Sequence, residues 1–217
     1  MGSSADNFTN RAPSPARAAI VLVVVAVTLT LLLTFIANLT RERIARNEQA
    51  WIQQRLDALV APQSHDNDLL TDRIEVTSPD ILGVNQPVTI YRARMNGRPV
   101  AAILHTVAPD GYQGPIELLV AVAFDGTLIG VQVVRHRETQ GLGDQFETTR
   151  RDWLKDFRGR SLDNPPQQRW SVRKDGGDFD AFTGATITPR AIVRATRRAL
   201  EYYASQRDRV FAAKPAP

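Results

Sequence analysis

The longest hydrophobic stretch of the chain lies near its start, at residues 18–37. It holds no charged residue and consists of Ala, Val, Leu, Ile and Phe, apart from three threonines. At about 1.5 Å per residue, a helix of this length spans roughly 30 Å, the thickness of the hydrocarbon core of a bilayer. Thr28, Thr30 and Thr34 are compatible with that position because a threonine hydroxyl can bond back to its own helix. We therefore predict a transmembrane helix over residues 18–38, surrounded by lipid.

Two other kinds of segment give a similar pattern. A cleaved signal peptide has a shorter apolar region, of about 7–15 residues, and a small-residue cleavage site. Residues 35–40 make a poor cleavage site, so a retained anchor is favoured. A buried helix of a soluble domain is disfavoured by the length of the stretch and by its many β-branched residues. The residues before it, 1–17, are rich in Ser, Pro, Ala and Asn and predict a flexible tail.

After the span, the spacing of hydrophobic positions is helical, then alternating, then helical again. Residues 40–60 have near-helical spacing and residues 62–82 are polar and interrupted by proline. We therefore expect a connector of helix and loop, residues 39–85, that packs on the domain. Short β-like segments follow, separated by tight-turn signals at Asn96-Gly97 and Asp125-Gly126. The expected strands are residues 87–93, 100–107, 116–124 and 127–135.

The last third of the chain returns to helical patterns. Helical features are expected at residues 146–157, and residues 170–174 predict a short strand before a glycine-rich turn. A final helix is predicted by one apolar face, formed by Ile192, Ala195, Thr196, Ala199, Leu200 and Tyr203. The predicted fold class is α+β: one N-terminal transmembrane helix, then a domain of residues 86–205 with an antiparallel sheet and packed helices. Residues 206–217 are expected to be a flexible C-terminal tail.

Composition removes several classes of function. The net charge is +4, from 27 Lys and Arg against 23 Asp and Glu, and the arginines are scattered among acidic residues, so no nucleic-acid partner is expected. The chain has no cysteine, which excludes disulfides, thiolate catalysis and cysteine-ligated zinc or iron–sulfur centres. Its three histidines have no metal-binding spacing, and no serine lies in a nucleophile elbow. We therefore predict neither a metal site nor a catalytic residue.

A loop of small residues and hydroxyls stands just before the final helix. It reads Asp-Ala-Phe-Thr-Gly-Ala-Thr over residues 180–186, and Thr188-Pro189 follow at a position typical of a helix N-cap and first helical residue. A helix start offers free N–H groups and the positive end of a dipole, so it would hold an anionic group near Thr186. On its own the loop is equally well a capped helix entrance, with Asp180 capping a turn.

Two further loops contain candidate binding residues. Residues 109–115 lead into a buried strand, with glycines that permit close backbone approach and with Tyr112, which could stack on a ring. Residues 135–144 place His136 beside Glu138, a pair that invites a general-base or metal interpretation. Each loop, taken alone, is also an ordinary connection between strands.

Two of these segments resemble motifs of one family. Residues 180–186 are similar to Asp-x-x-Ser/Thr-Gly-Ala-Thr, the flavinylation motif of membrane-tethered FMN-binding domains in Rnf-type and sodium-pumping quinone-reductase complexes. Residues 136–143 are similar to the His-x-Glu-Thr-Pro-Gly-Leu-Gly loop of the same domains, with Gln140 in place of the proline. The resemblance covers roughly residues 18–205 in the same order, and the arrangement is most similar to the G-subunit family of Rnf-type complexes.

The resemblance implies a cofactor and its site. FMN is expected to be joined through its phosphate to the hydroxyl of Thr186 as a phosphoester, by a dedicated flavin transferase, with Thr183 and Thr188 as competing hydroxyls. Asp180 would assist that reaction. Gly141 and Gly143 are expected to let the backbone pass close to the flavin ring. The other residues expected to contact FMN are Thr183, Gly184, Ala185, Glu138, Thr139, Leu142 and Tyr112.

The resemblance also implies a cellular role. The chain is expected to be a single-pass protein of the bacterial inner membrane, with residues 1–17 in the cytoplasm and the FMN domain on the periplasmic side. A count of the arginines that flank the span would give the opposite orientation, but long folded domains are translocated largely regardless of such charges. The expected function is electron relay among the other membrane subunits of an ion-translocating ferredoxin:NAD oxidoreductase-type complex, as an electron-transfer subunit rather than a stand-alone enzyme.

Two other functions fit the same residues. One is the C subunit of a sodium-pumping NADH:quinone reductase, which shares the chemistry but has different partners. The other is a non-redox, membrane-anchored FMN-binding or sensor module, which need not hold its flavin covalently.

Overall fold

The chain divides into two compact units, Met1–Trp51 and Ile52–Pro217. The computed structural model describes residues 15–78, 83–147 and 152–212. Most of the predicted flexible tail, residues 1–14, lies outside these ranges, but residues 15–17 are the first residues of a helix and were wrongly assigned to the tail.

The described part of the first unit is helical, and its surface is apolar over residues 18–37. It is the N-terminal part of α1 (Pro15–Leu59), which is long and apolar enough to cross a membrane. None of its most apolar stretch is buried by the rest of the protein. The hydroxyls of Thr28, Thr30 and Thr34 each donate to the carbonyl oxygen four residues earlier, at 2.8 Å. These hydroxyls are satisfied within the helix, as the sequence predicted, so they do not oppose burial in lipid.

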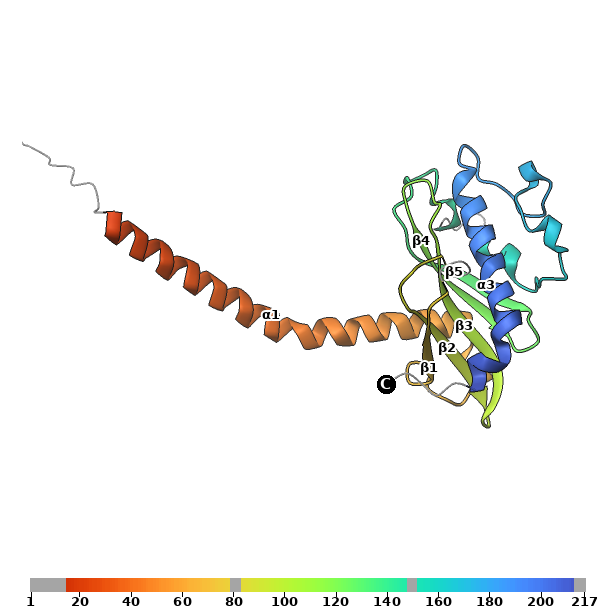
Figure 1. Ribbon diagram of the computed structural model, residues 1–217, viewed down its shortest axis with the longest axis horizontal. Helices are drawn as coiled ribbons and strands as arrows, with labels where there is room; N and C mark the ends of the chain where they lie inside the picture. The colour runs from red at the N-terminus through yellow and green to blue at the C-terminus, as the bar shows by residue number, and fades with distance from the viewer. Residues whose placement is uncertain (1–14, 79–82, 148–151, 213–217) are drawn as a thin grey trace, which may run out of the picture. The chain divides into compact units, whose positions relative to one another are not determined.

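The second unit is built on a five-stranded antiparallel sheet in which each strand pairs with the next along the chain (Figure 1). The strands are β1 (Arg73–Val76), β2 (Val88–Met95), β3 (Arg98–Ala108), β4 (Ile116–Ala123) and β5 (Leu128–Arg135). The predicted Asn-Gly turn joins β2 to β3: Met95 pairs with Arg98, and Asn96 and Gly97 have φ of 52° and 74°. Both central residues therefore have the positive φ that a tight hairpin turn requires.

Three local expectations differ from the structure. Strand β1 lies within the polar connector, where we predicted only loop and short helix. It is a four-residue edge strand, and its one buried residue, Ile74, pairs with Ile90. Residues 146–157 form two short 3₁₀ helices, η2 (Gln145–Glu147) and η3 (Trp153–Phe157), where they are described. The predicted strand at residues 170–174 is only a single bridge, between Val172 and Phe179.

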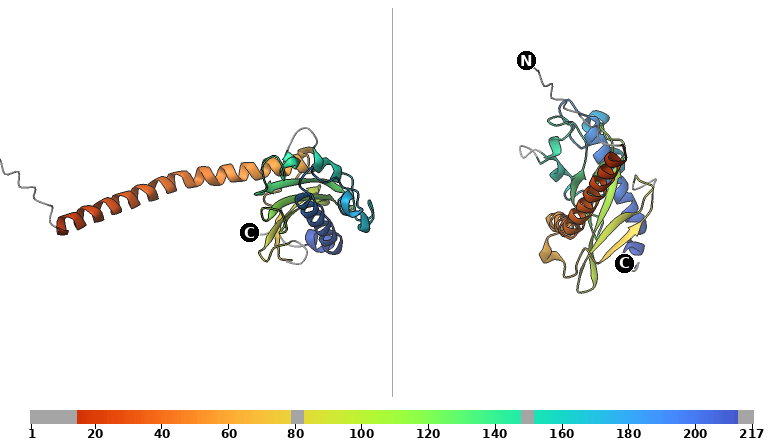
Figure 2. Two further views of the ribbon diagram at one scale, coloured as in Figure 1. Left: turned by 90° about the horizontal axis from the view of Figure 1, so that it is seen from above. Right: turned by 90° about the vertical axis from the view of Figure 1, so that its left-hand side faces the viewer.

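The sheet is covered on both faces (Figure 2). Helix α3 (Ile187–Ala212) packs on one face, over residues such as Ala102 and Leu104. The alternate residues of the same strand, Ala101 and Ile103, face a second cluster formed with the end of α1 and the connector. That second cluster also contains Leu56, Leu59, Val60 and Leu69. The central strands are therefore buried on both sides, which explains their nearly continuous hydrophobic sequence.

The segment between β5 and α3 has little regular structure and packs through aromatic rings. Phe157 stacks on Phe179 with ring centroids 4.7 Å apart, and Trp153 meets Phe182 edge-on at 5.0 Å. Trp170 joins the same cluster. The Trp153 indole N–H donates to the backbone oxygen of Asp180 at 2.9 Å. These rings, two of them from η3, anchor the loop that precedes α3.

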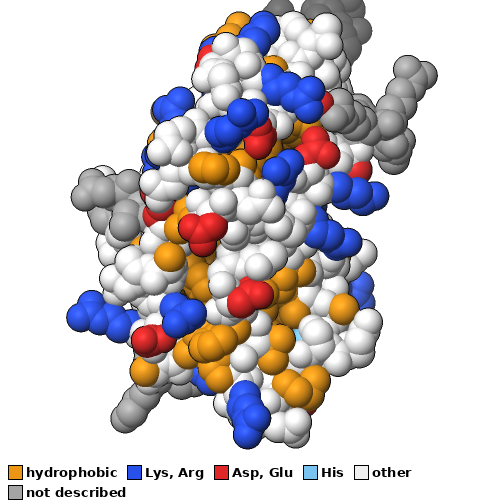
Figure 3. All heavy atoms as spheres, turned by 90° about the vertical axis from the view of Figure 1, so that its right-hand side faces the viewer, with side chains coloured by type: hydrophobic (Ala, Val, Ile, Leu, Met, Phe, Trp, Pro, Cys, Tyr) orange, Lys and Arg blue, Asp and Glu red, His pale blue; other side chains and the backbone are white. Residues whose placement is uncertain are grey.

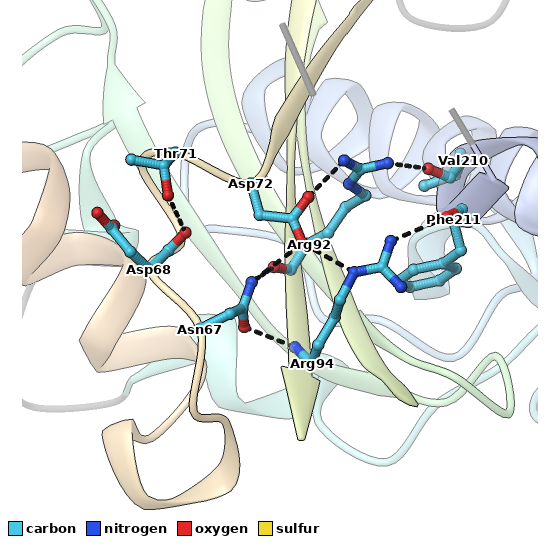
Figure 4. A network of polar contacts seen from close by, with 8 residues as sticks. All are labelled: Asn67, Asp68, Thr71, Asp72, Arg92, Arg94, Val210 and Phe211. Atoms are coloured by element: carbon cyan, nitrogen blue, oxygen red, sulfur yellow. Dashed lines mark hydrogen bonds and ion pairs between the residues drawn. The ribbon is translucent and has the colours of Figure 1, made fainter. Parts of the chain in front are cut away.

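Helix α3 extends further than predicted, to Ala212, so residues 206–212 are helical and were wrongly assigned to a flexible tail. Two arginines of β2 hold this end (Figure 4). Arg92, only 1% exposed, pairs with Asp72 and donates to the oxygen of Val210 at 2.9 Å. Arg94 also pairs with Asp72 and donates to the oxygen of Phe211 at 2.8 Å. The last carbonyls of a helix lack intrahelical donors, and the two guanidinium groups supply them.

Candidate functional site

Three loops meet at the end of the sheet where β3 ends, β4 begins and β5 ends. They are residues 109–115, residues 136–144 and the loop that enters α3. Between them lies a cavity of about 310 Å³. It is lined by Tyr112, Gln113, Glu138, Thr139, Leu142, Gly143, Gly184, Ala185, Thr186, Ile187 and Thr188.

Glu138 ties the three loops together. It is only 7% exposed, and one of its carboxylate oxygens accepts the backbone N–H of Gln113 at 3.0 Å. The other oxygen accepts the hydroxyl of Thr188, which is fully buried. The Gln113 side-chain amide also donates to Thr139 Oγ1 at 3.3 Å. A buried carboxylate is costly unless it is hydrogen-bonded, so these donors explain how Glu138 is accommodated beside the cavity.

The start of α3 differs from the sequence prediction. The helix begins at Ile187, and the N–H of Arg190 donates to the oxygen of Thr186 at 3.3 Å. Thr186, rather than Thr188, therefore occupies the N-cap position. Thr188 lies inside the first turn, where Pro189 is still tolerated because N–H groups of the first turn have no helical acceptor. The local sequence suited capping at Thr188, but its hydroxyl is used by the distant Glu138 instead.

Thr186 lies in the wall of the cavity and contacts a cation. Lys174 Nζ donates to Thr186 Oγ1 at 3.3 Å. Lys174 belongs to η5 (Arg173–Asp175), a short 3₁₀ turn between the bridge partners Val172 and Phe179. Its two neighbours in the turn are ion-paired: Arg173 with Asp180 at 2.9 Å, and Asp175 with both nitrogens of the Arg190 fork at 2.6 Å. The Arg190 guanidinium beside Asp175 holds the pKa of that carboxyl below its usual value.

Charges of both signs are interleaved over the face of the molecule shown in Figure 3, where Lys and Arg side chains stand beside Asp and Glu side chains. Arg194, one turn further along α3, pairs with Asp110 at 2.6 Å. This ion pair connects the helix to the first of the three loops.

The mouth of the cavity is apolar. Tyr112, Leu142 and Ile187 line it and are 64%, 48% and 45% exposed. Large exposed hydrophobic side chains are uncommon elsewhere in the described part of the second unit, where Phe124 is the only other one. Three apolar side chains around a cavity with buried polar groups at its base suit a flat, largely aromatic ligand with polar edges. The Thr186 hydroxyl and the neighbouring Lys174 ammonium suit an attached phosphate.

Two glycines of the second loop differ in their surroundings. A Cβ on Gly143 would lie 2.9 Å from both Cβ and Oε2 of Glu138 and 3.2 Å from Thr188 Oγ1, so no side chain fits there without displacing Glu138. Gly141 has φ of +78°, and a Cβ there would meet nothing within 4 Å. Gly141 is therefore explained by its turn, whose N–H donates to Asp144 Oδ1 at 2.7 Å, and not by close approach to the cavity.

His136 is held by neighbours of its own. Its Nδ1 accepts the backbone N–H of Glu138 at 3.1 Å, which leaves the ring proton on Nε2 to be donated to Glu147 at 2.9 Å. The ring also packs edge-on against Phe146, with centroids 5.0 Å apart. In the described ranges, no group of three or more His, Asp and Glu residues is arranged to hold a metal ion. His136 thus shapes the second loop.

Of the ten residues expected to contact a cofactor, eight line the cavity. Gly141 and Thr183 do not; the backbone oxygen of Thr183 accepts the side-chain amide of Gln145 at 3.0 Å. Gln140, at the position where the resembling loop has proline, is exposed and does not line the cavity.

Sequence reasoning missed Gln113, Ile187 and Lys174. Ile187 left a weak signal, an apolar residue directly after the small-residue motif. Lys174 left another, because it is one of only three lysines among 27 basic residues. Gln113 left none, because its backbone N–H and its side-chain amide both contact residues of a loop that is distant in the sequence.

The fold and this site define an FMN-binding domain behind an apolar N-terminal helix. The FMN-binding domain family matches residues 111–201, which include the cavity and most of α3. A second family, described as the RnfG N-terminal region, matches residues 13–59, which include α1.

The chain belongs to the G-subunit family of the ion-translocating oxidoreductase complex. It is 43% identical to the G subunit of Pseudomonas aeruginosa (strain UCBPP-PA14) over 185 residues, 85% of this chain and 86% of the relative. It is 47% identical to the G subunit of Photorhabdus laumondii over 173 residues, which are 78% of this chain and 81% of the relative. It is 41% identical to the G subunit of Shewanella loihica over 172 residues, which are 79% of this chain and 81% of the relative. The family resemblance inferred from the two motifs is thereby confirmed.

Proposed function

We propose that this chain is the membrane-anchored flavoprotein subunit that relays electrons within an ion-translocating oxidoreductase complex. The relatives carry the name of such a subunit, and the FMN-binding family matches the region that contains the cavity. The single observation that carries the proposal is the convergence of both sequence motifs on one cavity, with Thr186 in its wall. When bound, FMN supplies the redox chemistry, accepting and donating one or two electrons, while the protein supplies position and electrostatics.

We further propose that the cofactor is held covalently, through a phosphoester to Thr186. Thr186 Oγ would form a bond to the phosphorus of an activated flavin nucleotide, a phosphoanhydride. The anhydride P–O bond breaks, the nucleoside monophosphate leaves, and a base of the flavin transferase takes the hydroxyl proton. Thr186 is suited to this role because it lines the cavity at the start of α3 and is partly exposed, whereas Thr188 is buried and bonded to Glu138.

The chain's own residues would then divide the work of holding the cofactor. The apolar mouth formed by Tyr112, Leu142 and Ile187 would flank the ring and keep water from its faces. Thr139 and the backbone of Gly143 would meet its polar edge. Glu138 would hold the loops at their spacing, since both its oxygens are engaged by protein donors.

The same proposal covers the location. An apolar helix and a membrane-complex family fit a single-pass protein of the inner membrane. We propose that the FMN domain lies on the periplasmic side, with other subunits of the complex as partners. An exposed site with an open mouth suits transfer to and from partner proteins, because electrons must enter and leave through the surface.

The experiment is co-expression of the full chain with a flavin transferase, followed by a denaturing gel viewed by flavin fluorescence. The wild-type band should fluoresce, Thr186→Ala should be dark, and Thr183→Ala, a matched change in the same motif at an exposed position, should keep its fluorescence. A dark wild-type band would contradict covalent attachment and favour the sensor alternative. A fluorescent Thr186→Ala band with a dark Thr183→Ala band would move the acceptor to Thr183.

A further inference from the structure

We propose that Lys174 is the charge partner of the attachment site: its ammonium orients the Thr186 hydroxyl for modification and then neutralises the phosphodiester that forms there. This inference rests on the proposed function, because it assigns a role in covalent attachment. It goes beyond that function by naming a residue outside both sequence motifs and outside the residues that line the cavity.

The geometry of η5 directs three consecutive side chains to three places around the motif loop. Arg173 pairs with Asp180, Lys174 donates to Thr186 Oγ1 at 3.3 Å, and Asp175 receives the Arg190 fork. The turn ends at Gly176, whose φ of 83° places it in the left-handed region that favours glycine. The outer two residues of the turn are thus fixed by ion pairs that hold the middle one against Thr186.

Lys174 is left as an available cation. The carboxylates nearest in the chain, Asp175 and Asp180, are each engaged by an arginine, and among the described residues no carboxylate lies within 4.0 Å of Lys174 Nζ. Its one hydrogen bond in the described structure is to the hydroxyl of Thr186. An ammonium has three donors and no acceptor, so two remain for a further anionic group at the same place.

The type of side chain supports the same role. Of the 27 basic residues, 24 are arginine and three are lysine, at positions 155, 174 and 214. Arginine forms the paired contacts with carboxylates around the site, whereas lysine is a compact point charge suited to a single phosphate oxygen. A lysine at 174 reaches one hydroxyl without competing for the neighbouring carboxylates.

Before attachment, the ammonium donates to Oγ, which leaves the hydroxyl proton directed elsewhere and favours its loss to the base of the transferase. After attachment, Oγ is an ester oxygen and the phosphodiester carries one negative charge. Lys174 lies next to that charge, together with the free N–H groups at the start of α3. The same side chain therefore stabilises both the developing and the final charge.

The first test is the rate of flavin incorporation into the full chain at limiting transferase, followed by in-gel fluorescence. Lys174→Met should slow incorporation by about tenfold or more, since one donor aimed at a developing charge has at least that effect. Lys174→Arg keeps the charge but should restore only part of the rate, because its guanidinium would compete for the neighbouring carboxylates. Lys155→Met is the matched control: Lys155 is exposed and paired with Asp152, so its loss should leave the rate unchanged.

The second test measures the lysine itself. The protein with and without covalent flavin is treated with an amine-reactive reagent, and labelling at each lysine is read by mass spectrometry. Flavin attachment should protect Lys174 and leave Lys155 as reactive as before. Equal incorporation rates for the two Met variants, or equal labelling of Lys174 in both forms, would overturn the assignment. Absence of covalent flavin in the wild type would instead overturn the proposed function.

Discussion

At the scale of single residues, the role of each residue in the site depends on the atoms around it and not only on its residue type. Gly141 and Gly143 stand two positions apart in one loop, yet only Gly143 lies against Glu138. The sequence pattern gave both the same meaning, close passage of the backbone along a flavin ring. The surroundings separate them: one is a turn residue with a left-handed φ, and the other is packed against the carboxylate that joins three loops.

This difference gives a paired prediction. Gly143→Ala should displace the Glu138 carboxylate, so the protein should still receive flavin at Thr186 but show a shifted flavin absorption spectrum or midpoint potential. Gly141→Ala should cost about 1 kcal/mol of stability through backbone strain and leave the spectrum unchanged. The measurements are urea unfolding of the full-length protein and flavin redox titration. Matching spectra for both variants and the wild type would mean that the Glu138 arrangement does not govern the ring's surroundings.

At the scale of elements, the two faces of the sheet differ in character. The face under α3 carries the largest core cluster. The opposite face carries a row of three polar side chains, one from each of β3, β4 and β5, which we call the polar ladder. In that ladder His105 Nε2 lies 3.4 Å from Glu117 Oε2, and Arg135 lies 3.3 Å from the other oxygen of Glu117. Burial lowers the pKa of His105 from its usual value and outweighs the opposing effect of Glu117.

The ladder predicts a pH dependence of stability with a definite sign. The unfolded chain binds a proton at this histidine near pH 6.5, whereas the folded protein binds it only at lower pH. The contribution of His105 to the free energy of unfolding should therefore be constant above about pH 6.5 and fall as the pH drops below it, by at most about 1.4 kcal/mol per pH unit. Urea unfolding at several pH values measures it, and His105→Gln should flatten that part of the curve. An equal slope in the variant would assign the effect to other groups.

At the scale of the whole molecule, the role in electron relay depends on which side of the membrane each end occupies. The helix can cross a membrane, and the family is that of a membrane-complex subunit, but the flanking arginines favour the opposite orientation from the one proposed. Because the natural chain has no cysteine, a single introduced cysteine reports its own location.

We predict that Gln168→Cys reacts with a membrane-impermeant thiol reagent in intact spheroplasts. Gln168 is exposed in η4 (Gln167–Arg169), and is a better position than Arg160, which is partly buried and packs on Phe179. Ser4→Cys, on the other side of the span in sequence, is the matched control and should react only after lysis. The reverse pattern would place the FMN domain in the cytoplasm.

Much of this protein could be predicted from its sequence, where the relevant physics is local. An uncharged run of twenty residues is long enough for a bilayer whatever follows it, and Asn96-Gly97 specifies a tight turn because both residues accept positive φ. The two motifs, residues 136–143 and 180–186, identified the family because their residue types and order are specific. The four longer strands were predicted to within a few residues, because hydrophobic runs and the turn residues between them are also local signals.

Tertiary structure decided the features that depend on residues far apart in the chain. β1 is a strand only because β2 offers it hydrogen bonds, and residues 206–212 are helical with Arg92 and Arg94 bonded to the final carbonyls. Thr188 looked like a cap by local pattern, yet its hydroxyl is taken by Glu138, fifty residues earlier. Lys174 reaches Thr186 only because the η5 turn is folded against the helix start. Local sequence sets backbone preferences, but the partner of a polar side chain is chosen by what the fold brings within hydrogen-bonding distance.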